Sequence, residues 1–521
     1  MPDPGKFQQQ RGSKRSVGGY SFSPGSMEEI EQFKLQQANF RGQYEAVFPD
    51  HSAPKTIVII PSLTLDQQIL SKIKGHVYYE ERMLCMLLLL RMPHTHVIYI
   101  TSVPVDPIIV DYYLHLLPGI TGYHARQRLT LLSCYDSEAL SLTQKILQRP
   151  RLIERIRRSI PYGHLAHLAC FNVTPYERTL SVKLGIPIYG CDPDLYGWGT
   201  KSRSRQLFRE CDIPLPEGFE DVRDQEEMVE ALAELKNRNP LLEKAVIKMN
   251  DGFSGEGNAV FSYKGSPIET GMRNWIRKQL PKTLRIVADD MDYEQFIGKF
   301  EQMQGIVEEY IEGSNKQSPS VQCRITPLGR VDVISTHDQV LGGESEQVFL
   351  GAYFPASQEY GHEISAMGRR ISEELRDKGV LGRFSIDFLS VKEPFGWKHY
   401  AIEINLRKGG TTHPYLMLQF LTDGEYNEQN GIYYTANGQP RYYFATDNLY
   451  SERYHGLTPI DLLEVAISNG LHFDATLQEG VMFHLIGALS QFGKLGLVCI
   501  GDNVEKTKNI YRNTVDVLNK L

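Results

Sequence analysis

Short apolar segments rich in β-branched residues alternate with longer amphipathic segments in the first third of the chain. The apolar segments are residues 56–60, 97–101, 129–133 and 165–171, and helical patterns occupy residues 77–91, 106–117, 137–158 and 175–184. Strands that alternate with helices form parallel β-α-β units, and helices then cover both faces of the sheet. The sequence therefore predicts an open α/β domain over residues 55–198, preceded by a disordered tail and linker over residues 1–54.

Composition excludes several classes of protein. The net charge of −7 argues against a protein that coats nucleic acid or an anionic membrane. The longest apolar run, residues 83–90, is far shorter than the ~20 residues that span a bilayer. Seven scattered cysteines without a Cys-x-x-Cys pair indicate reduced thiols, neither a disulfide framework nor a cysteine zinc site, and predict a cytoplasmic protein.

Two later segments alternate apolar and polar residues and together carry the strongest chemical signal. In residues 383–389, Asp387 alternates with apolar residues. In residues 400–407, the polar residues that alternate with apolar ones are Glu403, Asn405 and Arg407. Side chains two residues apart share one face of a strand, and the short connection suits an antiparallel pair. We therefore expect these four side chains on one surface of a sheet.

Two carboxylates and an amide oxygen form a hard-oxygen site of the kind that binds Mg²⁺ bridging nucleotide phosphates. Arg407 beside them can hold a phosphoryl oxygen or a carboxylate. The alternative is a solvated sheet face with an ordinary ion pair, but aspartate and asparagine are both unfavourable in strands. The pattern favours a metal site made of Asp387, Glu403 and Asn405.

A lysine at the end of a predicted strand leads into a glycine-rich loop. Lys248 is followed by Gly252, Gly255 and Gly257, with Ser254 between them. Glycines let backbone N–H groups approach phosphate oxygens closely, although a hairpin with a mobile tip has the same pattern. The loop lacks the Gly-Lys-Ser/Thr ending of a Walker A motif, and no Gly-x-Gly-x-x-Gly follows the first strand, so a dinucleotide site is not expected.

Three further segments are ambiguous on their own. Residues 307–313, which include Glu308, Glu309 and Ile311, form a short strand and turn that can read a flat base or be an ordinary strand edge. Lys201 lies in a basic segment at the start of a predicted helix, and this segment either faces an anion or is solvated. The seven tyrosines between residues 426 and 454 can line a substrate pocket or pack in the core.

Taken in order, these segments resemble the ATP-grasp superfamily. The resemblance rests on Lys201, Lys248 before its glycine loop, the hinge at residues 308–313, and then Asp387, Glu403 and Asn405. Residues 59–62, 335–343 and 407–414 are similar to one branch, the peptide ligases of the pheganomycin type with a pre-ATP-grasp domain. The resemblance spans about residues 55–500.

The resemblance implies an α/β open-sheet pre-ATP-grasp domain followed by a two-lobed α+β ATP-grasp fold. The small lobe is expected over residues 199–312, and the large lobe with a C-terminal extension over residues 313–521. ATP and Mg²⁺ are the implied cofactors. By resemblance, the ATP-binding residues are Lys201, Lys248, Gly252, Ser254, Gly255, Gly257, Glu308, Glu309 and Ile311, the metal ligands are Asp387, Glu403 and Asn405, and the catalytic residues are Arg407 and Lys248.

The implied reaction activates a carboxylate as an acyl phosphate, which an amine then attacks, releasing ADP and phosphate. The implied partners are a small-molecule carboxylate and an amine or peptide acceptor, with neither nucleic acid nor membrane; the oligomeric state is left open, and a homodimer is compatible with it. The rival hypothesis is a non-catalytic nucleotide-binding protein acting as a sensor or scaffold. The residues that can contact the carboxylate substrate are Arg383, His337, Asp338, Gln339 and His413.

Overall fold

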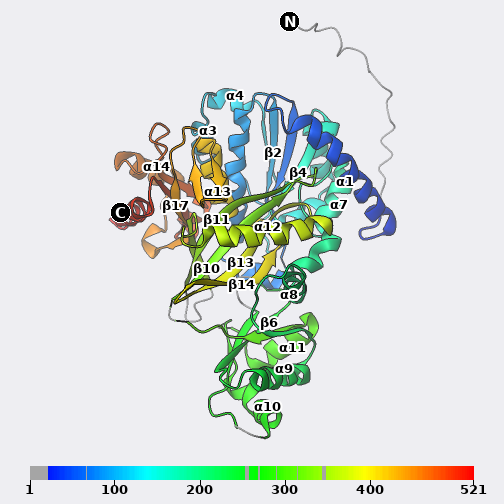
Figure 1. Cartoon of the computed structure of the whole chain (residues 1–521). Coiled ribbons are helices and arrows are strands. Elements are labelled where there is room, and N and C mark those ends of the chain that lie inside the picture. Colours follow the sequence, from blue (N-terminus) through cyan, green and yellow to red (C-terminus); the bar gives the residue numbers. More distant parts are fainter. Residues whose placement is uncertain are drawn as a thin grey trace.

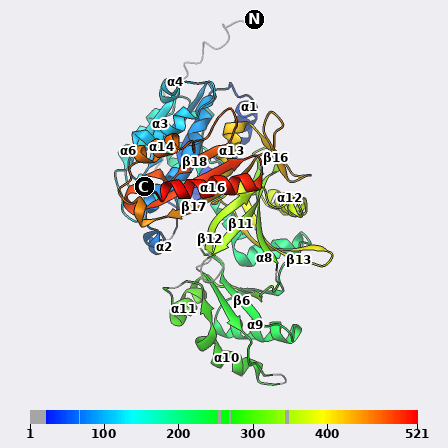
Figure 2. The same ribbon diagram turned by 90° about the vertical axis from the view of Figure 1, so that its left-hand side faces the viewer.

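The computed structural model describes residues 22–65, 67–252, 257–267, 270–288, 290–313, 315–342 and 348–520. Within these ranges the chain forms three main sheets, of four, eight and five strands, and a two-stranded ribbon. The five-stranded sheet and its helices form the lower lobe in Figures 1 and 2, and the four- and eight-stranded sheets form the upper body. No helix in the described ranges has the length and apolarity needed to cross a bilayer.

The N-terminal sheet is parallel, with strand order β3-β2-β1-β4. Alternate residues of β1 enter two different cores: Ile57 and Ile59 face one, and Val58 and Ile60 face the other. Both sheet faces are thus covered, as the uninterrupted apolar runs predict. The elements are α1 (Met27–Val47), β1 (Lys55–Ile60), α2 (Gln67–Lys72), the 3-10 helix η2 (His76–Arg91), β2 (Thr95–Thr101), α3 (Pro107–His115), α4 (Gly122–Arg126), β3 (Leu129–Ser133), α5 (Leu142–Leu147), α6 (Pro150–Ser159), η3 (Gly163–Leu165), β4 (Ala166–Cys170) and α7 (Pro175–Leu184).

The lower lobe contains an antiparallel sheet in the order β5-β9-β6-β7-β8. It has a core of its own, in which Phe261, Phe296 and Phe300 are buried. Its elements and the helices leading to it are η4 (Pro193–Gly199), α8 (Lys201–Glu210), β5 (Gly218–Val222), α9 (Gln225–Arg238), β6 (Lys244–Met249), β7 (Asn258–Ser262), α10 (Met272–Thr283), β8 (Arg285–Ile286), α11 (Tyr293–Met303) and β9 (Gly305–Glu309).

The largest sheet runs in the order β14-β13-β10-β11-β12-β17-β19-β18. Its core is continuous with one core of the N-terminal sheet, so these two parts pack as one body, whereas the lower lobe is a separate core. Its elements are β10 (Lys316–Ile325), β11 (Val331–Gly342), β12 (Val348–Phe354), α12 (Gly361–Asp377), β13 (Gly382–Glu393), β14 (Gly396–Asn405), α13 (Thr412–Thr422), β15 (Glu425–Asn427), β16 (Ile432–Tyr434), β17 (Tyr442–Tyr450), η5 (Glu452–Tyr454), α14 (Pro459–Ser468), β18 (Gly480–His484), η6 (Ile486–Ala488), α15 (Leu489–Phe492), β19 (Lys494–Gly501) and α16 (Val504–Leu518).

Two sequence predictions about the N-terminal region are wrong. The linker predicted up to residue 54 contains the helix α1, whose Phe33 and Phe40 are buried. Those apolar residues are too sparse to give a clear periodicity, and only packing against the sheet domain, with α7 among the contacts, selects the helix. The single helix predicted over residues 137–158 is two helices, α5 and α6, because Pro150 begins the second.

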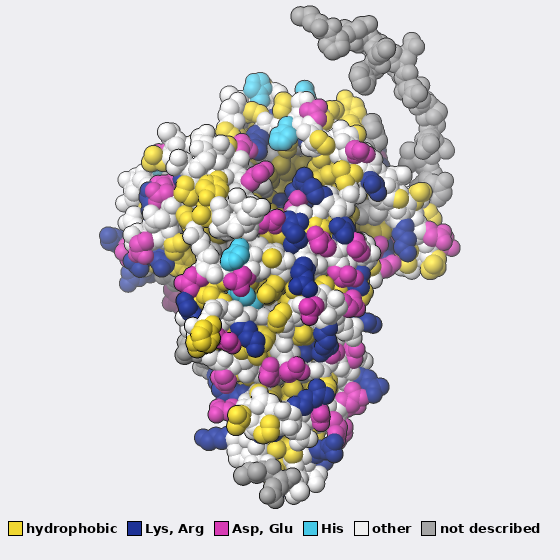
Figure 3. Space-filling view, in the orientation of Figure 1, with side chains coloured by type: hydrophobic (Ala, Val, Ile, Leu, Met, Phe, Trp, Pro, Cys, Tyr) yellow, Lys and Arg dark blue, Asp and Glu magenta, His cyan; other side chains and the backbone are white. Residues whose placement is uncertain are grey.

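Acidic and basic side chains are interspersed over the face of the molecule in Figure 3. Such mixing agrees with the modest net charge of −7. A protein that holds nucleic acid through its backbone phosphates gathers its basic residues on one face or stripe. The visible face therefore gives no support to a nucleic-acid partner.

Candidate functional site

The predicted antiparallel pair of polar strands is present as β13 and β14. Asp387 lies directly opposite Glu403, and Ser385 lies opposite Asn405. A bulge between Asp387 and Phe388 leaves Ile402 without a direct partner, so this side chain lines the cavity rather than the core face expected for it. Bulges that redirect side chains are common beside active sites.

Two neighbouring side-chain amides contact the Asp387 carboxylate. Its Oδ2 accepts a hydrogen bond from Asn405 Nδ2 at 3.0 Å, and its Oδ1 accepts one from Gln339 Nε2 at 3.3 Å. Burial, followed by the negative charge of Glu403, raises the pKa of Asp387 to about 6. Two facing carboxylates repel each other, so the pair favours a bound cation.

Lys248 faces this surface from the lower lobe and is held by Glu308. The Lys248 Nζ lies 2.6 Å from Oε1 of Glu308, whose other oxygen, Oε2, accepts from Arg205 at 2.5 Å. The side chains of Glu308 and Arg205 are only 3% and 1% exposed. Glu308 thus positions two cations of different elements, β6 and α8, and the carboxylate is fully engaged within the protein.

Lys201 links the lower lobe to the large sheet. It is the first residue of α8, and its Nζ lies 3.3 Å from Oε1 of Glu403. The sequence left open whether this basic helix start faces an anion or solvent. The anion that it faces in the structure is the glutamate opposite Asp387.

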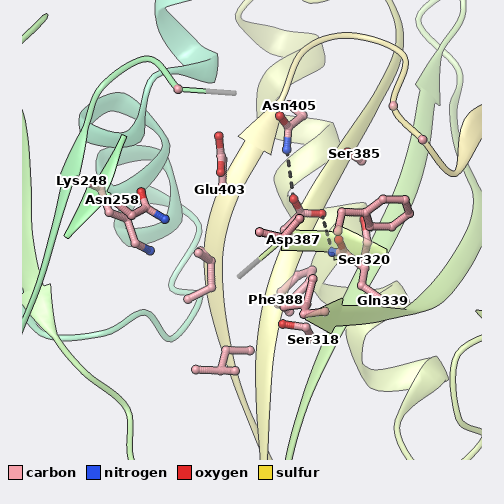
Figure 4. Close-up of a pocket in the computed structure, with 18 of the residues that line it drawn as sticks. Lys248, Asn258, Ser318, Ser320, Gln339, Ser385, Asp387, Phe388, Glu403 and Asn405 are labelled. Atoms are coloured by element: carbon pink, nitrogen blue, oxygen red, sulfur yellow. Dashed lines mark hydrogen bonds between the residues drawn. The ribbon is translucent and has the colours of Figure 1, made fainter. Parts of the chain in front are cut away.

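A cavity of about 710 Å³ lies between the lower lobe and the large sheet. Figure 4 shows Lys248 and Asn258 on one side and Asp387, Glu403 and Asn405 on the other. Of the residues predicted to bind nucleotide, metal or substrate, those that line the cavity are Lys201, Lys248, Gly252, Gly257, Glu308, Glu309, Ile311, Gln339, Asp387, Glu403, Asn405 and Arg407. Ser254 and Gly255 lie outside the described residues.

The glycine loop joins β6 to β7 at the rim of this cavity. Gly257 leaves little room for a side chain, because a Cβ there would lie 3.3 Å from Cβ of Met249 and 3.4 Å from the backbone oxygen of Asp251. Within the hinge at residues 308–313, the Glu309 N–H already donates to the Glu217 backbone oxygen at 2.8 Å. If main-chain groups of this region bind a nucleotide base, they are therefore groups other than the Glu309 N–H.

Two predicted substrate residues, the buried His337 and the half-buried Asp338, lie outside the cavity wall. His337 is fully buried, its Nε2 lies 2.7 Å from the Tyr443 hydroxyl, and burial lowers its pKa to about 3. Asp338 accepts hydrogen bonds from the Tyr360 hydroxyl at 2.6 Å and the Ser357 N–H at 2.8 Å. Neither side chain belongs to the cavity wall, whereas Gln339 beside them does.

The other two predicted substrate residues also lie outside the cavity wall. Arg383 is enclosed near the start of β13, and burial together with the charge of Arg324 lowers its pKa to about 10. His413, in the first turn of α13, is buried beside Asp447 and His484.

Several cavity residues were not anticipated. Ser318 and Ser320 lie on β10, and Ser320 is paired with Asp387. Their spacing of two residues, which puts both on one face of a strand, is a signal that could have found them. Arg82 comes from η2 and Asp447 from β17. These two residues are 365 positions apart in the sequence, so only the tertiary structure places them together at the cavity.

The tyrosines between residues 426 and 454 divide between the core and the surface. Tyr433, Tyr443 and Tyr454 are buried, and the rings of Tyr433 and Tyr443 lie 5.6 and 4.8 Å from that of Phe354. Tyr450 is exposed. None of the seven lines the cavity between the lobes, so packing in the core is the better interpretation for the buried ones.

The donor set of the cavity suits Mg²⁺. The two facing carboxylates of Asp387 and Glu403 and the amide of Asn405 offer oxygen donors, which this ion prefers. Lys201, Lys248 and Arg407 add positive charge on the surrounding wall. A polyanion such as a nucleotide triphosphate is complementary to this combination.

Comparison with known families agrees with this geometry. The family described as IQCH-like, ATP-grasp matches residues 194–285 and 270–429, and the family described as PGM1 C-terminal domain matches residues 461–514. The first match contains Lys201, Lys248, Asp387, Glu403 and Asn405.

Two curated proteins are similar over most of this chain. L-propargylglycine–L-glutamate ligase of Streptantibioticus cattleyicolor is 28% identical over 459 residues, which cover 86% of this chain and 91% of that protein. IQ motif-containing protein H of Danio rerio is 20% identical over 547 residues, which cover 94% of this chain. This chain spans about half, 51%, of the Danio rerio protein.

Solved structures share the fold. The ADP complex of N5-carboxyaminoimidazole ribonucleotide synthetase has a TM-score of 0.52 and 14% identity, covering 90% of this chain and 98% of that chain. The biotin carboxylase domain of Hydrogenobacter thermophilus 2-oxoglutarate carboxylase, in complex with MgADP, has a TM-score of 0.53 and 12% identity, covering 89% of each chain. At these identities the likeness concerns the fold alone.

Proposed function

We propose that this chain joins the carboxylate of one amino acid to the amino group of another amino acid or of a peptide. The premise is that the chain belongs to the ATP-grasp superfamily of ATP-dependent carboxylate–amine ligases. The observation that carries the proposal is the cavity in which Lys201, Lys248 and Arg407 surround the facing carboxylates of Asp387 and Glu403. The amino-acid class of the substrates follows the similar ligase of Streptantibioticus cattleyicolor, which is named for two amino acids.

The chemistry has two steps. An oxygen of the substrate carboxylate attacks the γ-phosphorus of ATP, and ADP leaves. The amine then attacks the acyl carbon, phosphate leaves with the bonding electron pair, and the amine loses a proton. A free carboxylate resists the second step because its oxide is a poor leaving group, and conversion to an acyl phosphate removes that obstacle.

The charged residues around the facing carboxylates, together with Asn405, have parts in this proposal. Lys201 and Lys248 contact the phosphates, and Arg407 steadies the transferred phosphoryl group through its planar guanidinium. Asp387, Glu403 and Asn405 would hold Mg²⁺, which when bound neutralises charge that develops on the phosphate oxygens. Glu308 is a positioning residue, because its carboxylate orients Lys248 and Arg205 and is itself buried.

The rival function, a sensor or scaffold that binds nucleotide without catalysis, is not favoured. A nucleotide can be held by lysines and main chain alone, so a protein that only binds has little need of the facing pair Asp387 and Glu403 with Arg407 beside it. The seven cysteines are buried free thiols, which supports the predicted cytoplasmic location.

The identity of the spent nucleotide tests the reaction type. If the carboxylate is activated as an acyl phosphate, turnover with pooled amino acids and Mg-ATP yields ADP and phosphate in a 1:1 ratio with the amide product. Chromatography of the nucleotides and mass spectrometry of the amides measure both. Stoichiometric AMP and pyrophosphate would instead indicate an acyl adenylate and would contradict the proposal.

The glycine loop between β6 and β7 is expected to close over the nucleotide. We expect saturating Mg-ATP to slow hydrogen exchange and proteolysis within residues 250–260, because loop N–H groups then bond phosphate oxygens and water is excluded from the acyl phosphate. Gly255→Val should weaken nucleotide use with little change in melting temperature.

The helix α9, on the lower lobe's own core, provides an internal reference for that exchange measurement. Its protection should change little with Mg-ATP. If the strands carrying Asp387 and Glu403 respond while residues 250–260 do not, the loop is a plain hairpin and another segment must shield the intermediate.

A further inference from the structure

Three buried side chains converge beside the cavity and have no part in the ligase reaction proposed above. His413 comes from α13, Asp447 from β17 and His484 from the end of β18. Their side chains are 4%, 9% and 0% exposed. The Nε2 atoms of the two histidines lie 3.0 Å apart, and Oδ1 of Asp447 lies 2.7 Å from Nε2 of His484 and 3.2 Å from Nε2 of His413.

This triangle has the dimensions of three ligands on one cation. Transition-metal ions bind imidazole nitrogen and carboxylate oxygen at about 2.1 Å. Two such ligands are then about 3.0 Å apart at the right angle of a facial, six-coordinate site, and about 3.4 Å apart at a tetrahedral angle. The three separations, 2.7, 3.0 and 3.2 Å, lie around the right-angle value on every edge. Two histidines and one carboxylate on one face of an ion leave the opposite positions open.

The surroundings hold the three ligands in place. A Cβ on Gly496, which pairs with His484 across β18 and β19, would come within 2.2 Å of the His484 Nε2, so glycine makes room for the imidazole. Oδ2 of Asp447 faces Nη1 of Arg82 at 3.3 Å, which leaves Oδ1 directed at the histidines. The Arg82 guanidinium lies 4.8 and 4.6 Å from the rings of Tyr79 and Phe171. Such outer contacts orient metal ligands in known sites.

The cluster is reachable from the cavity between the lobes. Asp447 lines that cavity together with Thr411, which lies two residues before His413, and Arg82. A cation bound here would therefore have open positions near the substrates while remaining apart from the carboxylate pair of β13 and β14. The nitrogen donors also set the two sites apart, because Mg²⁺ prefers oxygen ligands and imidazole suits zinc-like ions.

We propose that His413, Asp447 and His484 bind one divalent transition-metal ion of the zinc class, at a site separate from the Mg-ATP cluster. The competing occupant of the triangle is a proton: the Nε2–H of His484 would then donate to Asp447, as in an ordinary buried histidine–aspartate pair. The two states differ in whether a metal ion binds with one-to-one stoichiometry, and that can be measured without substrate or turnover.

Cobalt is a suitable probe because Co²⁺ takes zinc sites and reports them through visible absorption bands. The full chain is stripped with a chelator, dialysed and titrated with Co²⁺ in the absence of nucleotide. We expect bands that saturate at one equivalent, are abolished by Zn²⁺ and persist in excess Mg²⁺. Asp447→Asn and His484→Gln should weaken Co²⁺ binding by more than about 100-fold.

Matched variants separate this site from others. His399→Gln removes another buried histidine of the same sheet, which contacts Ser390, and should leave the Co²⁺ spectrum unchanged. Glu403→Gln weakens the carboxylate cluster and should also leave it unchanged. Gly496→Ala, which crowds His484 without removing a ligand, should weaken Co²⁺ binding.

Two results would overturn the proposal. One is a wild-type chain that shows no saturable visible bands and retains no zinc after reloading; the other is a folded Asp447→Asn protein with the wild-type Co²⁺ spectrum. If both ligand variants fail to fold, the wild-type titration with Zn²⁺ and Mg²⁺ as competitors still decides whether the chain binds one transition-metal ion. Loss of the ligase reaction in Glu403→Gln with an intact Co²⁺ site would show that the two sites are independent.

Discussion

Replacing Glu403 with glutamine is expected to lower turnover by roughly 100- to 10,000-fold while the melting temperature changes little. The substitution keeps the shape of the side chain but removes one of the two facing charges that would hold Mg²⁺. Glu403 is 27% exposed in the cavity, so solvent screens its pairing with Lys201 at 3.3 Å, and losing this pair costs less stability than losing a fully buried one. Steady-state release of ADP and a thermal melt measure the two effects.

Glu393→Gln is the matched control. Glu393 is an exposed glutamate at the end of β13, outside the cavity, and its loss should leave both turnover and melting temperature at the wild-type level. A folded Glu403→Gln protein that turns over nearly as fast as wild type would remove the support for a metal site on β13 and β14.

Glu308→Gln is expected to destabilise the lower lobe by about 3 kcal/mol. Glu308 is 3% exposed and bridges Arg205 and Lys248, so its neutralisation leaves Lys248 without its carboxylate partner and Arg205 with only Glu220 as an anion. Removing one member of a buried ion pair is costly because the remaining charge stays desolvated. Native-state hydrogen exchange of the β6 and β9 amides measures the loss locally, since this lobe has its own core.

Glu309→Gln is the neighbouring comparison, because this less buried residue makes a hydrogen bond to the Glu217 N–H that glutamine can also accept. Its effect should stay within about 0.5 kcal/mol. Glu308→Gln should also raise the KM for ATP, because Lys248 loses the group that orients it. Equal exchange rates in the two variants would show that the buried carboxylate contributes nothing to the lobe.

The alternation of the β13 and β14 segments was enough to predict that Asp387, Glu403 and Asn405 share one surface. Period-two patterning determines which residues share a face of a strand, and the short connection determines which strand pairs with which. The register places Asp387 opposite Glu403. The bulge that sends Ile402 into the cavity was not predictable, because one extra residue leaves no mark on the apolar pattern.

Residues 337–339 show where sequence reasoning about substrate contacts fails. Alternation says that His337 and Gln339 share a face, but His337 is covered by Tyr443 and Gln339 reaches Asp387. Tyr443, which covers His337, lies about a hundred residues further along the chain, so the strand's own sequence does not show which of its side chains is covered. The same applies to α1, which the sequence predicted as linker and which packing against the sheet domain makes helical.

The sequence by itself determined the parallel N-terminal sheet and the polar surface of β13 and β14, because these follow from periodicities of neighbouring residues along one chain segment. Tertiary structure alone decided that Arg82, His413, Asp447 and His484 meet, that Glu308 joins α8 to β6, and that Lys201 faces Glu403. These contacts join residues from 34 to 365 positions apart. No local pattern encodes such a contact, because it forms only after separate sheets and helices have packed together and buried the charged groups.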